Sequence, residues 1–255
     1  MEQLLLLYKP LGLTPLELIK RYREAHPEYK GQKMTYAGRL DPMAEGLVLI
    51  LTGEACNKKD DYLGLEKTYE ATILLGVQSD SLDLLGIVDE HTTETSFNQE
   101  KIQKALASIV GTHEWPYPNF SSHPVNGKPL FQWTREGAID QIEIPKRKMV
   151  IKTLSLNSIN SITSEDLLSL TNERVALVNG DFRQETILNQ WKSVLDESNK
   201  IFQTVSIELT VTSGTYIRSA ADQLGKILGC GACLLHLKRT VVGPYTTTLN
   251  TTLET

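Results

Sequence analysis

One acidic residue, Asp41, stands in a loop whose neighbours leave it little conformational freedom, and an apolar run follows directly. Gly38 permits backbone angles that other residues avoid, and Pro42 fixes the backbone behind the acid. Residues 47–51, Leu-Val-Leu-Ile-Leu, are of strand length and apolar throughout, which predicts a buried strand. The segment predicts a stiff, anchored loop that presents one carboxylate, although a Gly-x-x-Asp-Pro stretch on its own is more often only a turn.

Helix signals recur along the chain. Residues Thr14–Glu17 form a capping box with proline at the first helical position, which predicts a helix to about His26. A short helix is expected near residues 54–63 and a longer one near residues 98–110. Apolar residues of the longer helix recur at helical spacing, typical of a face packed on a core: Ile102, Ala105, Leu106 and Ile109.

Strand signals alternate with these helices. Residues 68–75 are expected to form a strand, and residues 205–211 alternate strictly between apolar and polar, as a half-buried strand does. Residues 112–127 contain three prolines, two histidines and three aromatic residues. That composition predicts a long loop rather than a packed element.

Residues 157–198 predict an αα-hairpin inserted into the surrounding fold. Thr163–Asp166 and Asp181–Gln184 have the residue types of helix starts, and Gly180 between them suits a C-cap. Six apolar residues predict a seam of the hairpin's own: Leu167, Leu170, Val175, Ile187, Trp191 and Leu195. We therefore expect the hairpin to be removable without loss of the surrounding fold.

Arg218 stands at a predicted helix start, where an unpaired arginine gains no electrostatic stabilisation from the helix dipole. Ser213–Thr215 are predicted to form a turn and cap that lead into a helix beginning near Tyr216, so Arg218 lies in the first helical turn. The helix dipole favours anions at that end, and the arginine therefore calls for a carboxylate partner. Asp41 is the partner that we expect, and Asp222, one turn later, is the alternative.

Composition sets wider bounds. A chain of 255 residues can bury a substantial core, and it contains no apolar stretch long enough for a membrane span. Its first residues lack the basic head of a signal peptide, so we expect a cytoplasmic protein. The net charge of −5 argues against unspecific coating of nucleic acid, but a local basic groove is compatible with it. Candidates for such a groove are Lys30, Lys33, Lys58, Lys59, Lys128, Lys146–Lys148, Lys238 and Arg239.

The three cysteines show no disulfide pattern, which suits a reducing compartment. Cys230 and Cys233 are followed by His236, and this spacing invites a zinc interpretation. Structural zinc takes four ligands, and no second pair is spaced to complete the site. We therefore expect no metal.

Several short motifs occur in one order along the chain. They are Gly38–Pro42 with Ala44 and Gly46, Gly53–Ala55, Glu66–Tyr69, Gly76 with Ser79–Asp83 and Gly86, Asn126–Lys128 with Arg135–Gly137, Gly214–Arg218 with Asp222–Gly225, and Leu237–Arg239. In these motifs the chain resembles the TruB family of tRNA pseudouridine synthases, over roughly residues 1–150 and 204–245, and their shared order is far more specific than any single motif. The similarity does not extend over residues 157–198.

The resemblance implies a fold and an activity. The fold would be one catalytic α+β domain over residues 1–255, with a mixed, mainly antiparallel β-sheet, flanking helices and the helical insertion. The activity would be isomerisation of a specific uridine in RNA to pseudouridine, with uridine 55 in the tRNA T-loop as the expected target. The reaction breaks the N1–C1′ bond, turns the base and rejoins it through C5. One carboxylate can serve it, either as a nucleophile or as a base at C2′.

The resemblance also implies roles for single residues. Asp41 would be the catalytic carboxylate, Arg218 would hold it, and Tyr69 would pack on the target base, which must be flipped into the pocket. Substrate-binding roles are implied for Leu237, Tyr36, Arg39, Asp83, Lys128 and Arg239. Pattern alone favours a core position for Leu237 and leaves Tyr69 open. The reaction needs no metal or organic cofactor, and the expected partner of this monomer is RNA, with no membrane contact.

The chain departs from the family pattern at several points. Tyr36 stands where a histidine is usual, and Pro124 where a lysine is expected. Residues 112–127 correspond to an RNA-gripping loop, which makes His113 and His123 candidate contacts or merely exposed side chains. The sequence ends shortly after the last motif, so we expect no C-terminal RNA-binding domain and a weaker grip on the acceptor arm.

Two alternatives therefore stay open. The chain could act on another RNA position with the same chemistry, or it could be an RNA-binding or RNA-folding chaperone without catalysis. The joint presence of Asp41, Tyr69 and Arg218 argues against the chaperone, because binding alone has little use for a buried acid and arginine pair.

Overall fold

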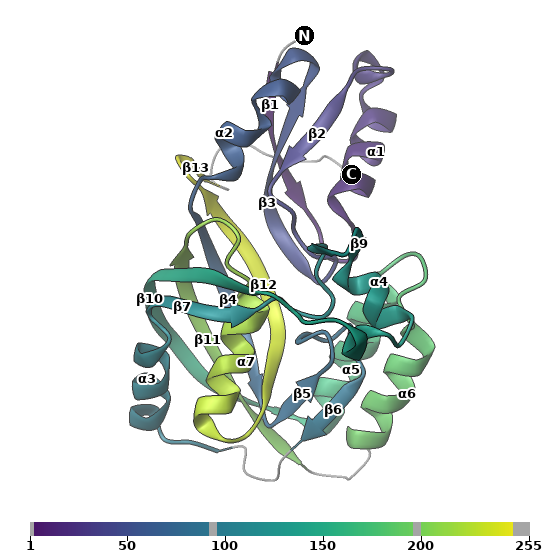
Figure 1. The fold of residues 1–255 in the computed structure, drawn as a ribbon. Helices are drawn as coiled ribbons and strands as arrows, with labels where there is room; N and C mark the ends of the chain where they lie inside the picture. The colour runs from purple at the N-terminus through teal and green to yellow at the C-terminus, as the bar shows by residue number, and fades with distance from the viewer. Residues whose placement is uncertain (1–2, 92–95, 196–199, 247–255) are drawn as a thin grey trace.

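A branched sheet of nine strands runs through the computed structural model, which describes residues 3–91, 96–195 and 200–246 (Figure 1). Its strands are β1 Gln3–Lys9, β2 Met34–Ala37, β3 Ala44–Thr52, β4 Lys67–Leu75, β7 Gly111–Pro116, β10 Lys146–Thr163, β11 Ile201–Val211, β12 Ala232–Val242 and β13 Tyr245–Thr246. The hydrogen-bonded order is β1-β3-β12-β4-β11-β10-β7, with β2 on β3 and β13 on β12. Two small hairpins lie outside this sheet: β5 Val77–Ser79 with β6 Val88–His91, and β8 Pro124–Val125 with β9 Lys128–Pro129.

Strand directions confirm the predicted mixed, mainly antiparallel sheet. Within the described residues, β3 and β12 form a parallel pair, and the other pairs of the sheet are antiparallel. The parallel ladder spans Leu237↔Ala44, Lys238↔Glu45 and Arg239↔Gly46. Beyond it, the far end of β3 pairs with β2 instead. Strand β3 therefore joins an N-terminal arm to the main body of the sheet, as Figure 1 shows.

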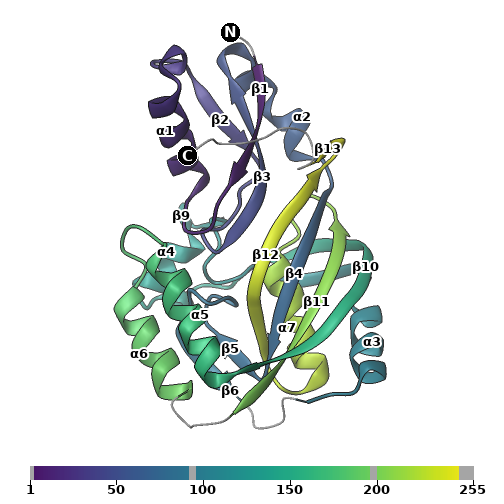
Figure 2. The same ribbon diagram turned by 180° about the vertical axis from the view of Figure 1, so that it is seen from behind.

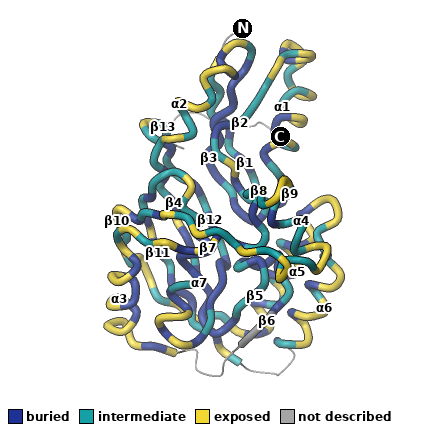
Figure 3. Tube along the Cα trace, in the orientation of Figure 1, coloured by how far each residue is buried: buried dark blue, intermediate teal, exposed yellow. Residues whose placement is uncertain are grey.

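Helices cover both faces of this body (Figures 1 and 2). They are α1 Pro15–Ala25, α2 Lys59–Leu63, α3 Gln99–Ser108, α4 Leu130–Arg135, α5 Ser164–Ala176, α6 Gln184–Leu195 and α7 Ile217–Leu228. Successive residues of a strand point to opposite faces, so Ile73 packs with α3 and α7 while Leu74 packs with α5 and α6. Figure 3 shows the resulting buried centre along β3, β4 and β12. None of the helices in the described part of the chain has the length and apolar character to cross a membrane.

The predicted helix starts are largely confirmed. The Thr14 N–H donates to Glu17 at 2.7 Å and the Glu17 N–H donates back to Thr14 Oγ1 at 3.2 Å, which completes the capping box of α1. Asn98 caps α3, and the predicted apolar face of α3 is buried. The short helix expected near residues 54–63 consists of a 3₁₀ segment, Gly53–Lys58, followed by α2. The cap of α7 is Tyr216, whereas Thr215 Oγ1 accepts from the Val150 N–H on β10, so the predicted cap at 213–215 is wrong.

The long loop predicted over residues 112–127 is wrong in its first part. Residues 111–116 form β7, which pairs with β10 from Gly111↔Ile151 to Pro116↔Lys146. This strand lies at the edge of the sheet, so it pairs with one strand, β10, and packs on the core with one face. Trp115 is the buried residue of that face. An edge position also tolerates Pro116 at the strand end, and the proline-rich composition concealed the strand.

The helical segment starts later than predicted. Strand β10 continues through residues 157–163 and stays paired with β11 as far as Thr163↔Ile201, so the boundary at 157 is wrong. Thr163 caps α5 as expected, with the Asp166 N–H donating to its Oγ1 at 3.1 Å. Leu177, not Gly180, is the C-cap of α5, and Gly180 lies in the connection with φ +92°.

The buried apolar residues of the α5–α6 hairpin pack against the sheet as well as against each other. Its buried residues share one cluster with the sheet residues Leu74, Phe202 and Cys233 and with Leu84 of the β5–β6 hairpin. Trp191 is 0% exposed in this cluster, and its Nε1 donates to the Gly86 carbonyl at 3.0 Å. The expectation of a self-contained seam is therefore wrong, because the same apolar stripe that joins the two helices also packs on the sheet.

Candidate active site

A buried arginine holds the loop that carries Asp41, between β2 and β3. The Arg239 side chain is 1% exposed and donates three hydrogen bonds to main-chain carbonyls. Nε donates to the Leu47 carbonyl at 2.7 Å, Nη1 to the Arg39 carbonyl at 3.2 Å and Nη2 to the Gly38 carbonyl at 3.3 Å. Three main-chain carbonyls on both sides of Asp41 are thus fixed by one planar cation. The Arg239 guanidinium is therefore turned inward, and a substrate contact through it stays a prediction.

Two buried lysines stand close to this loop, and neither was predicted as a site residue. Lys9 Nζ donates to the carbonyls of Pro10 at 3.0 Å and Leu13 at 2.7 Å. Burial lowers the pKa of Lys9 to about 7, against the opposing field of Asp41. Lys67 Nζ donates to the Leu63 and Leu65 carbonyls, and burial, helped by Arg239, lowers its pKa to about 8.

Arg218 meets Asp41 across the junction of arm and body, as predicted. It lies in the first turn of α7, with Nε 2.9 Å from Asp41 Oδ2, and the side chains are 5% and 34% exposed. Its Nη1 donates to the Ser81 carbonyl at 2.7 Å and its Nη2 to the Phe120 carbonyl at 3.3 Å. Burial works to lower the pKa of Arg218, but the nearby carboxylates outweigh it and raise this pKa. The alternative partner, Asp222, instead pairs with Lys226 at 2.7 Å.

Asp83 is a second acid on the same cation. Its Oδ2 lies 3.9 Å from Arg218 Nε, and its Oδ1 accepts from Ser81 Oγ at 2.6 Å and from the Leu85 N–H at 3.0 Å. Burial raises the pKa of Asp83, although Arg218 opposes the shift. The more exposed Asp41 is therefore the carboxylate of this group that faces outward, while Asp83 supports Arg218 from inside.

A pocket opens where these groups meet an apolar wall. Its lining residues are Asp41, Met43, Ala44, Asp83, Arg218, Leu234, His236 and Leu237. Of the predicted residues, the structure thus brings together Asp41, Arg218, Asp83 and Leu237. Tyr69 is 7% exposed within the main core cluster, which also contains Leu237, and it does not line the pocket.

The other predicted contacts lie outside the pocket. Arg39 Nη2 is 3.5 Å from the Tyr36 hydroxyl, and Lys59 Nζ lies 5.4 Å from the centre of the Tyr36 ring. Lys128 pairs with Glu136 and lies 3.6 Å from the centre of the Trp133 ring. These residues present cations and aromatic faces near the surface rather than at Asp41.

His236 is a pocket residue that the sequence did not assign. Its Nε2 lies 2.8 Å from Glu45 Oε1, and Tyr8 donates its hydroxyl to Glu45 Oε2 at 2.7 Å. Burial would raise the pKa of Glu45, but the bonds from Tyr8 and His236 lower it overall. His236 therefore pairs with a carboxylate, whereas Cys230 Sγ donates to the Gly231 carbonyl at a helix end. The spacing of His236 after two cysteines had suggested only the zinc interpretation.

Candidate RNA contacts in the 112–127 region are engaged in ring stacking. His113 stacks on Trp115 with ring centres 4.8 Å apart, and His123 stacks on Tyr117 at 3.9 Å. Tyr117 also meets the Tyr216 ring edge-on at 5.7 Å, close to Arg218. The irregular segment after β7 therefore forms an aromatic layer beside the first turn of α7.

Comparison with known proteins gives this geometry a context. Residues 26–173 match the family model described as TruB family pseudouridylate synthase (N terminal domain). The chain is 32% identical over 254 residues to tRNA pseudouridine synthase B of Burkholderia mallei (strain NCTC 10247), covering 100% of this chain and 68% of that protein. It is 27% identical over 252 residues to tRNA pseudouridine synthase B of Blochmanniella floridana, covering 99% and 80%.

Solved structures with the same fold include a Cbf5-Nop10-Gar1 complex, with a TM-score of 0.59, 18% identity and coverage of 96% of this chain and 50% of that chain. An H/ACA RNP bound to a substrate RNA containing 2′-deoxyuridine matches with a TM-score of 0.55, 17% identity and coverage of 96% and 48%. The chain thus spans about half the length of these solved chains. At such identity the likeness establishes the fold, and the matches in sequence establish the family. The chain belongs to the TruB family of pseudouridylate synthases.

Proposed function

We propose that this protein isomerises uridine 55 in the T-loop of tRNA to pseudouridine, with Asp41 as the catalytic carboxylate. The curated relatives are named tRNA pseudouridine synthase B. The observation that carries the proposal is the ion pair between outward-facing Asp41 and buried Arg218, at 2.9 Å, in a pocket with an apolar wall. A site of this kind fixes one carboxylate against a flat, uncharged substrate such as a uracil base.

The chemistry assigned to Asp41 is the breaking of the glycosidic bond. Either its oxygen attacks C1′ as the N1–C1′ bond breaks, or it removes the C2′ proton as that bond breaks. In the first route the detached uracil turns and C5 attacks C1′, which displaces the Asp41 carboxylate. In the second route C5 bonds to C1′ and the proton held by Asp41 returns to C2′. In both routes C5 then loses its proton and N1 gains one. Arg218 fixes the direction of the carboxylate and offsets part of its charge, which lessens repulsion of an incoming RNA backbone.

Leu237 and Tyr69 are assigned to the base. Leu237 lines the pocket, and its partner on the neighbouring strand is Ala71, two residues after Tyr69 on the same face of β4. Leu237 and Tyr69 belong to one core cluster, so we assign the Tyr69 ring to the support of the apolar wall. A base flipped into the pocket would gain stacking and apolar contact there, which offsets the cost of unstacking.

Affinity for RNA is assigned to residues outside the pocket. Tyr36, Arg39 and Lys128 offer cations and aromatic faces to phosphates and bases. Asp83 is assigned to the support of Arg218, whose Nε lies 3.9 Å from the Asp83 carboxylate. We further propose a cytoplasmic monomer with one catalytic domain, in which the α5–α6 hairpin is an insertion.

An Asp41→Asn variant tests the central assignment. It keeps the size of the side chain and removes its charge, so conversion of T-loop uridine in a tRNA transcript should fall by orders of magnitude. Affinity for tRNA should stay within about tenfold of the parent's, or 1.4 kcal/mol, because phosphate contacts lie elsewhere. Asp61→Asn, at an exposed acid on α2, is the matched control and should convert at the parent's rate.

Several outcomes would change the proposal. Conversion by Asp41→Asn at a rate near the parent's would remove Asp41 from the chemistry. Pseudouridine formed by the parent at a different uridine would keep the chemistry and replace the target. A parent that binds and anneals RNA without forming pseudouridine would leave only the chaperone alternative.

A further inference from the structure

The turn between β5 and β6 supports Arg218 from its inner side. Ser81 offers its carbonyl to Arg218 Nη1 at 2.7 Å, and Asp83 faces Arg218 Nε at 3.9 Å. The turn is closed by Asp80, whose N–H donates to the Ile87 carbonyl at 2.9 Å and whose Oδ1 accepts from the Ile87 N–H at 2.9 Å. Any movement of residues 79–87 would therefore move two of the groups that hold Arg218.

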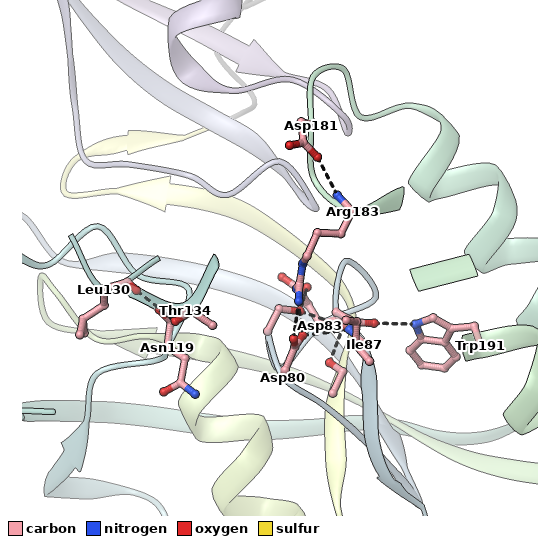
Figure 4. Close-up of polar contacts among 12 residues, drawn as sticks. Asp80, Asp83, Ile87, Asn119, Leu130, Thr134, Asp181, Arg183 and Trp191 are labelled. Carbon is pink, nitrogen blue, oxygen red and sulfur yellow. Dashed lines mark hydrogen bonds and ion pairs between the residues drawn. The ribbon is translucent and has the colours of Figure 1, made fainter. Parts of the chain in front are cut away.

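Arg183, in the connection between α5 and α6, grips this turn from outside (Figure 4). Its Nη1 and Nη2 lie 2.7 Å and 3.2 Å from the two oxygens of Asp80, a two-pronged ion pair. The Cζ of Arg183 also lies 4.4 Å from the centre of the Phe120 ring. The main-chain carbonyl of Phe120 accepts a hydrogen bond from Arg218 Nη2. Arg183 thus touches both segments whose carbonyls bind Arg218.

The backbone at Arg183 is itself unusual. Its φ is +63°, a left-handed conformation that a non-glycine residue rarely adopts, and its N–H donates to Asp181 Oδ1 at 3.3 Å.

The α5–α6 hairpin contacts the same turn a second time, because Trp191 Nε1 donates to the Gly86 carbonyl at 3.0 Å (Figure 4). A third contact reaches the Asp41 loop, since Leu177 packs against Gly12, whose N–H donates to the Pro42 carbonyl at 2.9 Å.

We propose that Arg183 is a positioning residue, which clamps the 79–87 turn and Phe120 against Arg218 and so fixes the direction of the Asp41 carboxylate. Both prongs of its guanidinium are occupied by Asp80, which leaves Arg183 poorly placed to bind an RNA phosphate. The catalytic consequence rests on the proposed function, whereas the clamp itself is a property of the protein alone. The hairpin thereby becomes part of the support of the site rather than an appendage.

The kinetic test uses single-turnover conversion of tRNA with saturating enzyme, together with binding of the same tRNA. Arg183→Gln should lower the rate constant by about tenfold and leave Kd within about twofold. Asp80→Asn keeps the acceptor for Ile87 and should reproduce this loss, and the double variant should lose no more than either single variant. Arg183→Lys, which restores the charge without the fork, should recover part of the rate. Lys192→Gln, an exposed charge on α6, is the control for hairpin charge and should match the parent.

A raised Kd with an unchanged rate constant would overturn the proposal and make Arg183 an RNA contact. Additive losses in the double variant would show that Arg183 and Asp80 act separately. Amide hydrogen exchange without RNA tests the clamp itself: peptides covering residues 79–87 and 117–121 should exchange faster in Arg183→Gln than in the parent. Unchanged exchange there overturns the clamp whatever the activity. A parent that never converts uridine refutes the proposed function alone and leaves this exchange result standing.

Discussion

Replacing Trp191 with alanine tests whether the α5–α6 hairpin belongs to the core of the sheet. The side chain is completely buried among residues of the hairpin, the β5–β6 turn and the sheet, and its Nε1 holds the Gly86 carbonyl. Such a truncation loses apolar burial, opens a cavity and leaves a buried carbonyl unpaired. We expect the free energy of unfolding to fall by about 3–5 kcal/mol.

The two parts of that loss can be separated. Trp191→Phe keeps most of the apolar contact and removes the hydrogen bond, so it should cost about 1–3 kcal/mol. Leu16→Ala, at a side chain 57% exposed on α1, is the control and should change stability by less than about 0.5 kcal/mol.

Chemical denaturation followed by far-ultraviolet circular dichroism measures these differences. A shared core predicts one cooperative transition whose midpoint moves in Trp191→Ala with little change in slope. If the parent unfolds in two steps and the substitution moves only a small first step, the hairpin has a core of its own and the reasoning fails. Loss of the hairpin's helical signal ahead of the sheet would likewise indicate a separate core.

Two further substitutions have expected outcomes of their own. The pKa of Lys9 is about 7 in the folded protein. Between roughly pH 7 and 10 the unfolded chain therefore binds one proton more than the folded protein. The free energy of unfolding of the parent should rise by about 1.4 kcal/mol per pH unit relative to that of Lys9→Met. If urea denaturation gives the same difference between the two proteins at every pH in this range, the expectation is contradicted. Gly46→Ala should lower Tm far more than Gly31→Ala. Both glycines have positive φ, but a Cβ at residue 46 would lie 2.2 Å from the Arg239 carbonyl oxygen, whereas one at residue 31 would face open space. Equal losses of Tm would show that the backbone angle φ alone determines the cost.

The sequence predicted the central ion pair because both partners had local reasons to be there. A glycine and a proline stiffen the Asp41 loop, and Arg218 occupies a helix start that disfavours a lone cation. Arg239 was expected in a basic groove because a lysine–arginine pair suggests phosphate binding, whereas its side chain is buried. The alternation of β12 already placed Arg239 on the face of Leu237, inside the protein, and that signal was available.

Other features were not readable in the residues. Lys9 and Lys67 bind main-chain carbonyls, which have no side-chain signature in a sequence. Strand β7 and the far half of β10 carry polar residues, because positions near a sheet edge need little apolar surface. The stripe that includes Trp191 correctly predicted a buried helix face, but a stripe does not reveal which neighbour covers it.

The insertion of β12 between β3 and β4 sets a condition on synthesis of the protein. Asp41 leaves the ribosome well before Arg218, Leu237 and Arg239, and the pocket is complete once β12 adds its three-pair parallel ladder to β3. Contacts of such long sequence separation form late in folding. A nascent chain interrupted before Arg239 would therefore be inactive, however much of its antiparallel sheet had already folded.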